Sequence, residues 1–191
     1  MPYNPNIHNR QSIRLKGYDY SKPGYYFVTF NIKDRLPLFG EFIKENNTRI
    51  MKHTELGKAA IKYWLEIPEH YPNVILDEFI IMPDHIHGII QISERAQNIE
   101  PPQAQNIEPQ NIESGLVQNI EPRQNQYQKI IPGSLGAIIR GYKIGVTKWA
   151  KQNGYNNFKW QRNFHEKIIH NNRALNNIRQ YIKNNPKNWK K

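Results

Sequence analysis

The sequence VILDEFIIMPDHIHGIIQI, residues 74–92, predicts two strands joined by a tight turn. Both halves are rich in β-branched and aromatic residues, which is typical of strands, and Pro83-Asp84 between them is a turn dipeptide. We therefore predict strands at 74–82 and 85–92. Because side chains alternate along a strand, His85 and His87 must project from one face and Ile86 from the other.

The neighbouring segments complete an α+β pattern. Residues 25–32 predict a strand, and apolar residues at helical spacing predict a helix over 56–67 with Thr54 as its N-cap. Ser134 is predicted to cap a second long helix, followed by a weaker strand at 164–169 and a last helix at 171–184. The order β-α-β-β-α-β plus a C-terminal helix favours the ferredoxin-like split βαβ fold, an antiparallel sheet with the first and third strands at its centre.

The stretch 94–128 differs in composition from the rest of the chain. The tetrapeptide Gln-Asn-Ile-Glu occurs in it four times, starting at Gln97, Gln105, Gln110 and Gln118. Apolar residues are sparse and the copies are irregularly spaced, which argues against a solenoid repeat. We predict a flexible low-complexity insertion in a surface loop, within a single domain that spans residues 1–191.

Composition favours a polyanionic partner. The 191 residues include 27 Lys and Arg against 16 Asp and Glu, a net charge of +11. Neutralised phosphates release counterions, so such an excess favours binding to nucleic acid. The absence of cysteine excludes disulfides and thiolate-rich zinc sites. No run approaches the ~20 apolar residues of a membrane span, and no signal peptide is evident. We expect a cytoplasmic, nucleoid-associated protein without a membrane partner.

The histidine pair is the first candidate site. A His-X-His pattern alone is a weak signal, and two partly exposed polar residues are the simplest interpretation. We expect Ile86 to share an apolar core face with Ile80, Met82 and Ile90. The histidine face must then meet solvent, a metal or nucleic acid. Imidazole combined with oxygen ligands and open positions fits Mg²⁺ or Mn²⁺.

Tyr181 is the second candidate. It shares a stripe of the last helix with Leu175, Ile178 and Ile182, so it is expected to face the sheet, where a tyrosine often only packs. Asn185 lies one turn further on, although Pro186 disfavours helical ψ there. A phenol has a pKa near 10, so attack on a phosphodiester would need a nearby cation.

Several separated motifs, in order along most of the chain, carry a family resemblance. They are Arg14-Leu15-Lys16-Gly17-Tyr18-Asp19-Tyr20, Gly24-Tyr25-Tyr26-Phe27-Val28-Thr29-Phe30, Phe79-Ile80-Ile81-Met82-Pro83-Asp84-His85-Ile86-His87, Ser134-Leu135-Gly136-Ala137-Ile138-Ile139-Arg140-Gly141-Tyr142-Lys143, Trp160-Gln161-Arg162-Asn163-Phe164-His165-Glu166 and Ile178-Arg179-Gln180-Tyr181-Ile182-Lys183-Asn184-Asn185-Pro186. With these motifs the chain resembles the REP-associated tyrosine transposases, a branch of the single-tyrosine HUH transposases.

The resemblance implies an activity and a set of site residues. It implies a ferredoxin-like fold with His85 and His87 as metal ligands, Asn185 completing the metal site and Tyr181 as the nucleophile. The implied substrate is single-stranded DNA with hairpins, cleaved to a covalent 5′-phosphotyrosine and a free 3′-hydroxyl and then rejoined during DNA transposition. The insertion at 94–128 departs from the family pattern.

Basic residues outside the apolar stripes are expected to hold the DNA backbone. They are Arg14, Arg140, Lys143, Lys151, Lys183 and Lys187. The alternative is a nucleic-acid-binding protein or repressor without catalysis, which would use exposed aromatics of the first strand, Tyr25, Phe27 and Phe30. A rolling-circle replication initiator would share the chemistry. A monomer and a homodimer both remain open.

Overall fold

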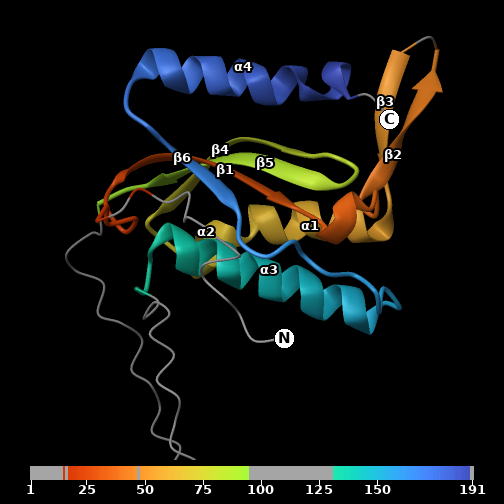
Figure 1. The fold of residues 1–191 in the computed structure, drawn as a ribbon, viewed down its shortest axis with the longest axis horizontal. Coiled ribbons are helices and arrows are strands. Elements are labelled where there is room, and N and C mark those ends of the chain that lie inside the picture. The colour runs from red at the N-terminus through yellow and green to blue at the C-terminus, as the bar shows by residue number, and fades with distance from the viewer. Residues whose placement is uncertain (1–14, 16, 47, 95–130, 190–191) are drawn as a thin grey trace, which may run out of the picture.

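The computed structural model describes residues 15, 17–46, 48–94 and 131–189 (Figure 1). A four-stranded antiparallel sheet has the order β4-β5-β1-β6. Its strands are β1 (Gly24–Asn31), β4 (Val74–Ile81), β5 (His85–Ile92) and β6 (His165–Ile169). The predicted antiparallel α+β fold is confirmed, and so is the prediction that the first strand and the histidine strand lie at the centre of the sheet. The predicted insertion at 94–128 falls almost entirely outside the described residues.

Helices cover both faces of this sheet (Figure 1). α1 (Glu55–Leu65) and α3 (Leu135–Gln152) lie on one face, and α4 (Asn172–Asn188) lies on the other. A short helix, α2 (Ile67–His70), follows α1. Thr54 and Ser134 accept hydrogen bonds from the first turns of α1 and α3, as predicted, and Asn171 does the same for α4.

A second, two-stranded sheet was not predicted. Strands β2 (Gly40–Glu45) and β3 (Thr48–His53) form an antiparallel hairpin, preceded by a short 3-10 segment, η1 (Lys33–Arg35). The hairpin carries several charged residues and little buried surface, so its sequence lacks the pattern of a strand packed on a core. It lies at the end of the molecule reached by the C-terminal end of α4 (Figure 1).

The main core lies between the sheet and the helices α1 and α3. Trp64 of α1 is fully buried, and its ring stacks on Phe30 and Phe79 of the sheet. The indole also packs directly on the backbone of Gly88, where an added Cβ would lie 2.3 Å from a Trp64 ring carbon. A glycine between His87 and Ile89 therefore permits the close approach of α1 to the histidine strand.

A smaller core lies under α4. Its buried members are Ile89, Ile169, Leu175 and Ile182. Ile80, which pairs with His87 across the β4–β5 ladder, packs here rather than beside Ile86, so our assignment of Ile80 to the Ile86 face was wrong. Ile81 pairs with Ile86 and shares its face, because the turn between β4 and β5 does not preserve the alternation counted from Ile80 to Ile86.

Two further details differ from the sequence predictions. Phe30 is 1% exposed in the main core, on the face opposite Phe27, so the first strand does not present three aligned aromatics. α4 continues to Asn188 with Pro186 inside its last turn, so the predicted helix end at 184 was wrong. Pro186 lies near the end of the helix. Proline cannot donate a backbone hydrogen bond, and at this position few further bonds of the helix are disturbed.

Candidate functional site

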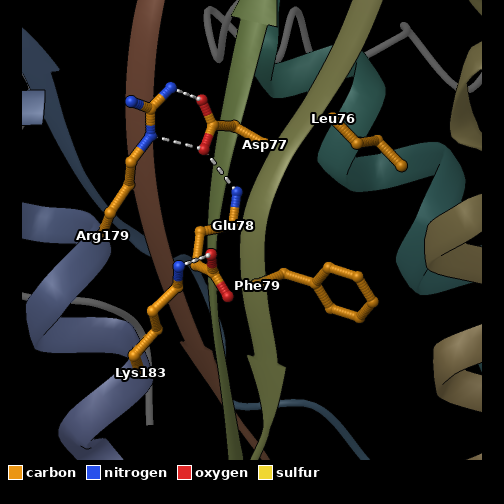
Figure 2. A pocket seen from close by; sticks show the side chains of 6 residues that line it. All are labelled: Leu76, Asp77, Glu78, Phe79, Arg179 and Lys183. Carbon is orange, nitrogen blue, oxygen red and sulfur yellow. Dashed lines mark hydrogen bonds and ion pairs between the residues drawn. The ribbon is translucent and has the colours of Figure 1, made fainter. Parts of the chain in front are cut away.

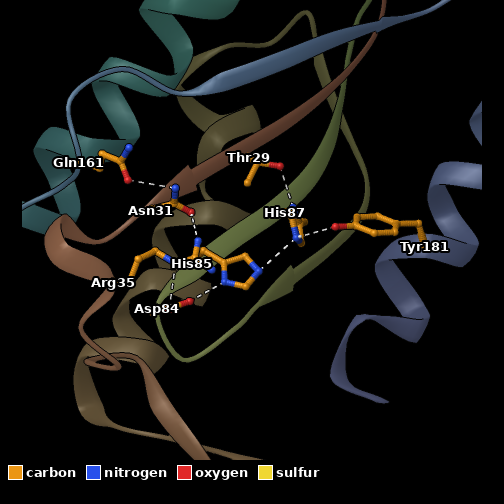
Figure 3. A network of polar contacts seen from close by, with 8 residues as sticks. All are labelled: Thr29, Asn31, Arg35, Asp84, His85, His87, Gln161 and Tyr181. Carbon is orange, nitrogen blue, oxygen red and sulfur yellow. Dashed lines mark hydrogen bonds and ion pairs between the residues drawn. The ribbon is translucent and has the colours of Figure 1, made fainter. Parts of the chain in front are cut away.

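His85 and His87 of β5 turn their ring nitrogens toward each other beneath α4 (Figure 3). Their Nε2 atoms are 3.1 Å apart, and each residue is only 5% exposed. The sequence placed both on one face of a central strand, which the structure confirms. It did not indicate their depth, because alternation reveals which face a side chain occupies and not what covers that face. The histidine face lies under α4 and is largely closed to solvent, and its contact with a metal or nucleic acid stays a prediction.

Each imidazole is held from behind by an oxygen. Asp84 Oδ1 lies 2.6 Å from His85 Nδ1, and Thr29 Oγ1 lies 2.7 Å from His87 Nδ1. Thr29 pairs directly with His87 across the β1–β5 ladder. Asp84 is the fully buried turn residue that precedes β5. A carboxylate accepts the Nδ1 proton of His85, so the Nε2 of this ring presents its lone pair to the centre of the site.

The two Nε2 atoms face each other too closely to carry two opposed lone pairs, so a proton or a cation must lie between them. Burial, then the charges of His85 and Arg35, lower the pKa of His87 to about 3. His87 is therefore neutral at physiological pH, which is the form of imidazole that binds metals. The space between the two Nε2 atoms is therefore better suited to a metal cation than to the additional proton that would charge His87.

The separation of the nitrogens would allow both to bind one cation. Two adjacent ligands with bonds of about 2.1 Å are about 3.0 Å apart at an octahedral centre and about 3.4 Å apart at a tetrahedral one. The 3.1 Å between the two Nε2 atoms lies within this range. Among the described residues no cluster of three or more histidine and carboxylate side chains surrounds one point, so further ligands would be amide, water or substrate oxygen.

Tyr181 of α4 points toward His87, from the right in Figure 3. Its hydroxyl lies 3.4 Å from His87 Nε2, and its ring meets the rings of His87 and Phe27 edge-on. The residue is 49% exposed, so part of its side chain is open to solvent. The structure thus brings together three of the four residues predicted for the catalytic and metal sites.

Asn185, the fourth, is half-buried one turn beyond Tyr181. No hydrogen bond joins it to either imidazole in the described part of the chain. Since Pro186 lies within α4, Asn185 retains helical geometry and occupies the same flank of the helix as Tyr181. Its role in metal binding stays a prediction.

Sequence reasoning missed Arg35, which belongs to the same network. Its Nε lies 3.1 Å from Asp84 Oδ2, and its Nη1 donates to Asn31 Oδ1 at 2.6 Å. Asn31 in turn donates to Gln161 Oε1, so the network continues beyond β1 (Figure 3). Asp34 and Arg35 both adopt positive φ, 57° and 55°, a strained conformation for residues other than glycine. No motif marks this arginine, because the η1 turn sets its position.

Trp189 borders the site on the side of the hairpin. Its ring lies 5.6 Å from the ring of His85 and 6.3 Å from that of Phe42 in β2. Arg49 of β3 donates to the carbonyl of Trp189 at 2.7 Å. The residue after α4 is therefore tied to the unpredicted hairpin, and both lie beside the histidine pair.

The predicted DNA-binding residues fall on two different layers. Arg140, Lys143 and Lys151 belong to α3, across the sheet from Tyr181, whereas Lys183 and Lys187 belong to α4. Lys143 is half-buried and donates to the carbonyls of Gln161 and Asn163, and burial lowers its pKa to about 8. Arg14 lies outside the described residues. Only the residues on α4 lie on the same layer as Tyr181.

The α3 layer carries a groove of about 660 Å³. Cationic side chains stand around an apolar floor there, and the lining includes Arg140, Lys143, Ile144, Lys148, Lys151 and Trp160. None of the lining residues is acidic.

Comparisons with known proteins come from sequence and from structure. A protein of Haemophilus influenzae (strain ATCC 51907 / DSM 11121 / KW20 / Rd), described only as an uncharacterized protein, is 38% identical over 188 residues, covering 98% of this chain and 93% of that protein. The chain belongs to the same family as this Haemophilus protein. No family model matches the chain.

Among solved structures, a REP-associated tyrosine transposase bound to a REP hairpin superposes with a TM-score of 0.54. The match covers 92% of this chain and 73% of that one at 16% identity. At this identity the likeness establishes a shared fold. None of the helices in the described part of the chain is long and apolar enough to cross a membrane.

Proposed function

We propose that this protein is a transposase that cleaves and rejoins single-stranded, hairpin-bearing DNA through a covalent bond to Tyr181. The observation that carries the proposal is the Tyr181 hydroxyl, on a half-exposed residue, 3.4 Å from Nε2 of His87 in a buried histidine pair. A structural core has no need to bury two imidazoles whose Nε2 atoms converge under a phenol. The shared fold with a tyrosine transposase supports the same assignment.

The reaction we propose is a transesterification. The Tyr181 oxygen forms a bond to phosphorus as the bond from phosphorus to the 3′-oxygen breaks. The phenol proton passes to solvent, and the leaving 3′-oxygen takes a proton to become a free 3′-hydroxyl. The 5′-phosphotyrosine keeps the energy of the phosphodiester, so the reverse attack by a 3′-hydroxyl rejoins DNA without a nucleotide cofactor.

His85, His87 and Asn185 would hold Mg²⁺ or Mn²⁺. The fit rests on the 3.1 Å separation of the two Nε2 atoms and on Asp84 and Thr29, which fix the rings from behind. When bound, the ion supplies Lewis-acid polarisation of the scissile phosphate and stabilises developing negative charge. Arg35, fixed by Asp84 near the pair, adds positive charge at the same position.

The basic residues would bind the DNA strand on both sides of the cleavage point. Lys187 lies near the end of α4, on the same layer as Tyr181, and the groove on α3 offers cations around apolar and aromatic surface, a combination suited to phosphates and stacked bases. We expect weaker binding and a shallower salt dependence when Arg140 or Lys151 is replaced by alanine.

A covalent trap tests the proposal. Labelled single-stranded hairpin DNA is incubated with the protein and Mn²⁺ and then run on a denaturing gel. We expect a protein–DNA adduct with the parent and none with Tyr181→Phe, while binding by the variant persists. Tyr155→Phe, on the α3 side of the molecule, is the matched control and should form the adduct normally.

Two results would reject the assignment. An adduct formed by Tyr181→Phe would remove Tyr181 as the nucleophile. Binding without any adduct from the parent, with or without metal, would favour the non-catalytic alternative. Burial of Phe30 already weakens that alternative, because the first strand offers no open aromatic platform for RNA.

A further inference from the structure

We propose that two ion pairs between the edge strand β4 and α4, Asp77–Arg179 and Glu78–Lys183, position Tyr181 over the histidine pair (Figure 2). We call this set of four residues the β4–α4 clamp. The inference rests on the proposed role of Tyr181 and adds positioning residues to it. Three features support the clamp. They are the bulge in β4, the opposite flanks of α4 that carry the clamp and Tyr181, and the small apolar surface that α4 buries.

A β-bulge creates the acidic half of the clamp. Successive side chains of a regular strand point to opposite faces, so Asp77 and Glu78 would normally diverge. The β4–β5 register shifts between Leu76 and Phe79, and both carboxylates turn toward α4 (Figure 2). Bulges commonly redirect a side chain in this way beside functional sites.

The Asp77 pair has a bidentate geometry. Arg179 Nε donates to Asp77 Oδ1 at 2.9 Å, and Nη2 donates to Oδ2 at 2.6 Å. Such a fork fixes orientation as well as distance. Hydrogen bonding to Arg179 also lowers the pKa of Asp77, which keeps the carboxylate charged. Lys183 Nζ lies 3.2 Å from Glu78 Oε2, so the second pair lies one helical turn further along α4.

The clamp and Tyr181 occupy opposite flanks of α4. Arg179 and Lys183 are four residues apart and share a flank, whereas Tyr181 lies two residues from each and is therefore about 160° away around the helix axis. The apolar stripe containing Ile182 lies between the two flanks. A rotation of the helix that lifted the clamp from β4 would consequently swing the hydroxyl relative to His87.

Apolar packing alone fixes this rotation weakly. α4 buries only Leu175 and Ile182, whereas α3, of similar length, buries six residues. A rotation of about 20° displaces an atom ~6 Å from the axis by about 2 Å. Displacements of about 1 Å at a reacting group can reduce rates about a hundredfold. The ion pairs therefore act where the chemistry is most sensitive to geometry.

The decisive experiment measures adduct formation and DNA binding for Asp77→Asn, Arg179→Gln and the double variant. We expect each single variant to form the adduct about 10- to 100-fold more slowly at saturating DNA. The double variant should be no slower than the worse single one, because both lose the same interaction. Glu55→Gln and Lys58→Gln, an exposed pair on α1, are matched controls and should leave the rate unchanged.

Asp77→Asn separates positioning from DNA contact. If Arg179 instead served to bind phosphate, removing its carboxylate partner would strengthen DNA binding and leave cleavage intact. The clamp predicts slower cleavage with binding changed less than about threefold. Unchanged adduct rates in both single variants would overturn the proposal.

Hydrogen exchange of the DNA-free protein tests the clamp independently of the chemistry. Asp77→Asn and Arg179→Gln should speed amide exchange over residues 175–183 and leave β1 and β5 protected. Unchanged exchange in α4 would refute the clamp. The variants could exchange faster while the parent forms no adduct. That result would refute the role of Tyr181 and would leave the ion pairs only as the anchor of α4.

Discussion

The two faces of the central sheet differ in how they are filled. On the α1 and α3 face, buried apolar residues form one continuous cluster, in which Trp64, Phe30 and Tyr142 pack ring against ring. On the α4 face, an apolar cluster with four buried members stops at His87, and polar groups take over. The apolar packing is thus concentrated on the α1 and α3 face and the proposed chemistry on the α4 face, so substitutions on the two faces should have separable effects.

The largest expected effect is on the chemical face. His87→Ala should slow adduct formation at least about a thousandfold. Loss of this ligand would remove the cation, which in our proposal lowers the free energy of the charged transition state by several kcal/mol. Cleavage should fail at concentrations of Mg²⁺ or Mn²⁺ that saturate the parent. The rate is measured by denaturing gel against metal concentration, and folding is checked by circular dichroism.

His165→Ala is the control for His87→Ala. His165 is exposed on β6 and pairs with Thr29 from the other side of β1, so its loss should leave cleavage and metal dependence as in the parent. A His87→Ala protein with the parent's metal dependence would mean that the imidazole is not a ligand.

The corresponding substitution on the opposite face is Trp64→Ala. Removal of a fully buried indole should lower the free energy of unfolding by about 3–5 kcal/mol, measured by urea denaturation. Activity per folded molecule should remain. Leu65→Ala, at a neighbouring residue that is 54% exposed, should change stability by only about 0.5 kcal/mol. Loss of cleavage in folded Trp64→Ala protein would show that the two faces are coupled.

The long-range arrangement of the chemical face could be predicted from sequence, because regular periodicity carries it. Alternation in β5 put His85 and His87 on one face, and helical spacing in α4 brought Tyr181 to that face. The caps at Thr54 and Ser134 follow from short-range hydrogen bonding that their residue types favour. These features depend on regular spacings of two to four residues along the chain.

The remaining features depend on irregular backbone, which periodicity does not encode. The bulge at Asp77 and Glu78 reverses the face of one residue, and positive φ at Arg35 turns its side chain toward Asp84. The strands β2 and β3 of the hairpin mix charged residues with adjacent apolar pairs, so they lack the apolar alternation that would predict them. The sequence therefore predicted the histidine pair and the position of Tyr181 beside it, but not the groups that orient them.

A smaller effect is expected from Asp84→Asn, which tests these orienting groups. An amide cannot supply the charge that polarises His85 Nδ1, so metal affinity should fall about 10- to 100-fold. Affinity is measured by isothermal titration with Mn²⁺ in the absence of DNA. Asp34→Asn, at an exposed neighbour of Arg35, should bind the metal as the parent does. Equal affinity in both variants would show that Asp84 does not tune the site.

The smallest expected effect is the pH-dependent contribution of Asp77 to stability. Hydrogen bonding to Arg179 lowers the pKa of Asp77 in the folded state, so the folded protein binds this proton less readily than the unfolded chain. The stabilisation is therefore complete above the ordinary carboxyl pKa of about 4 and is lost as the pH falls through the folded-state value. Because the pair is partly exposed, it should amount to about 1 kcal/mol or less at low salt. Urea unfolding of the parent and Asp77→Asn should differ by this amount at neutral pH and converge in acid, and a difference that persisted in acid would mean that the carboxylate's charge is not what holds α4.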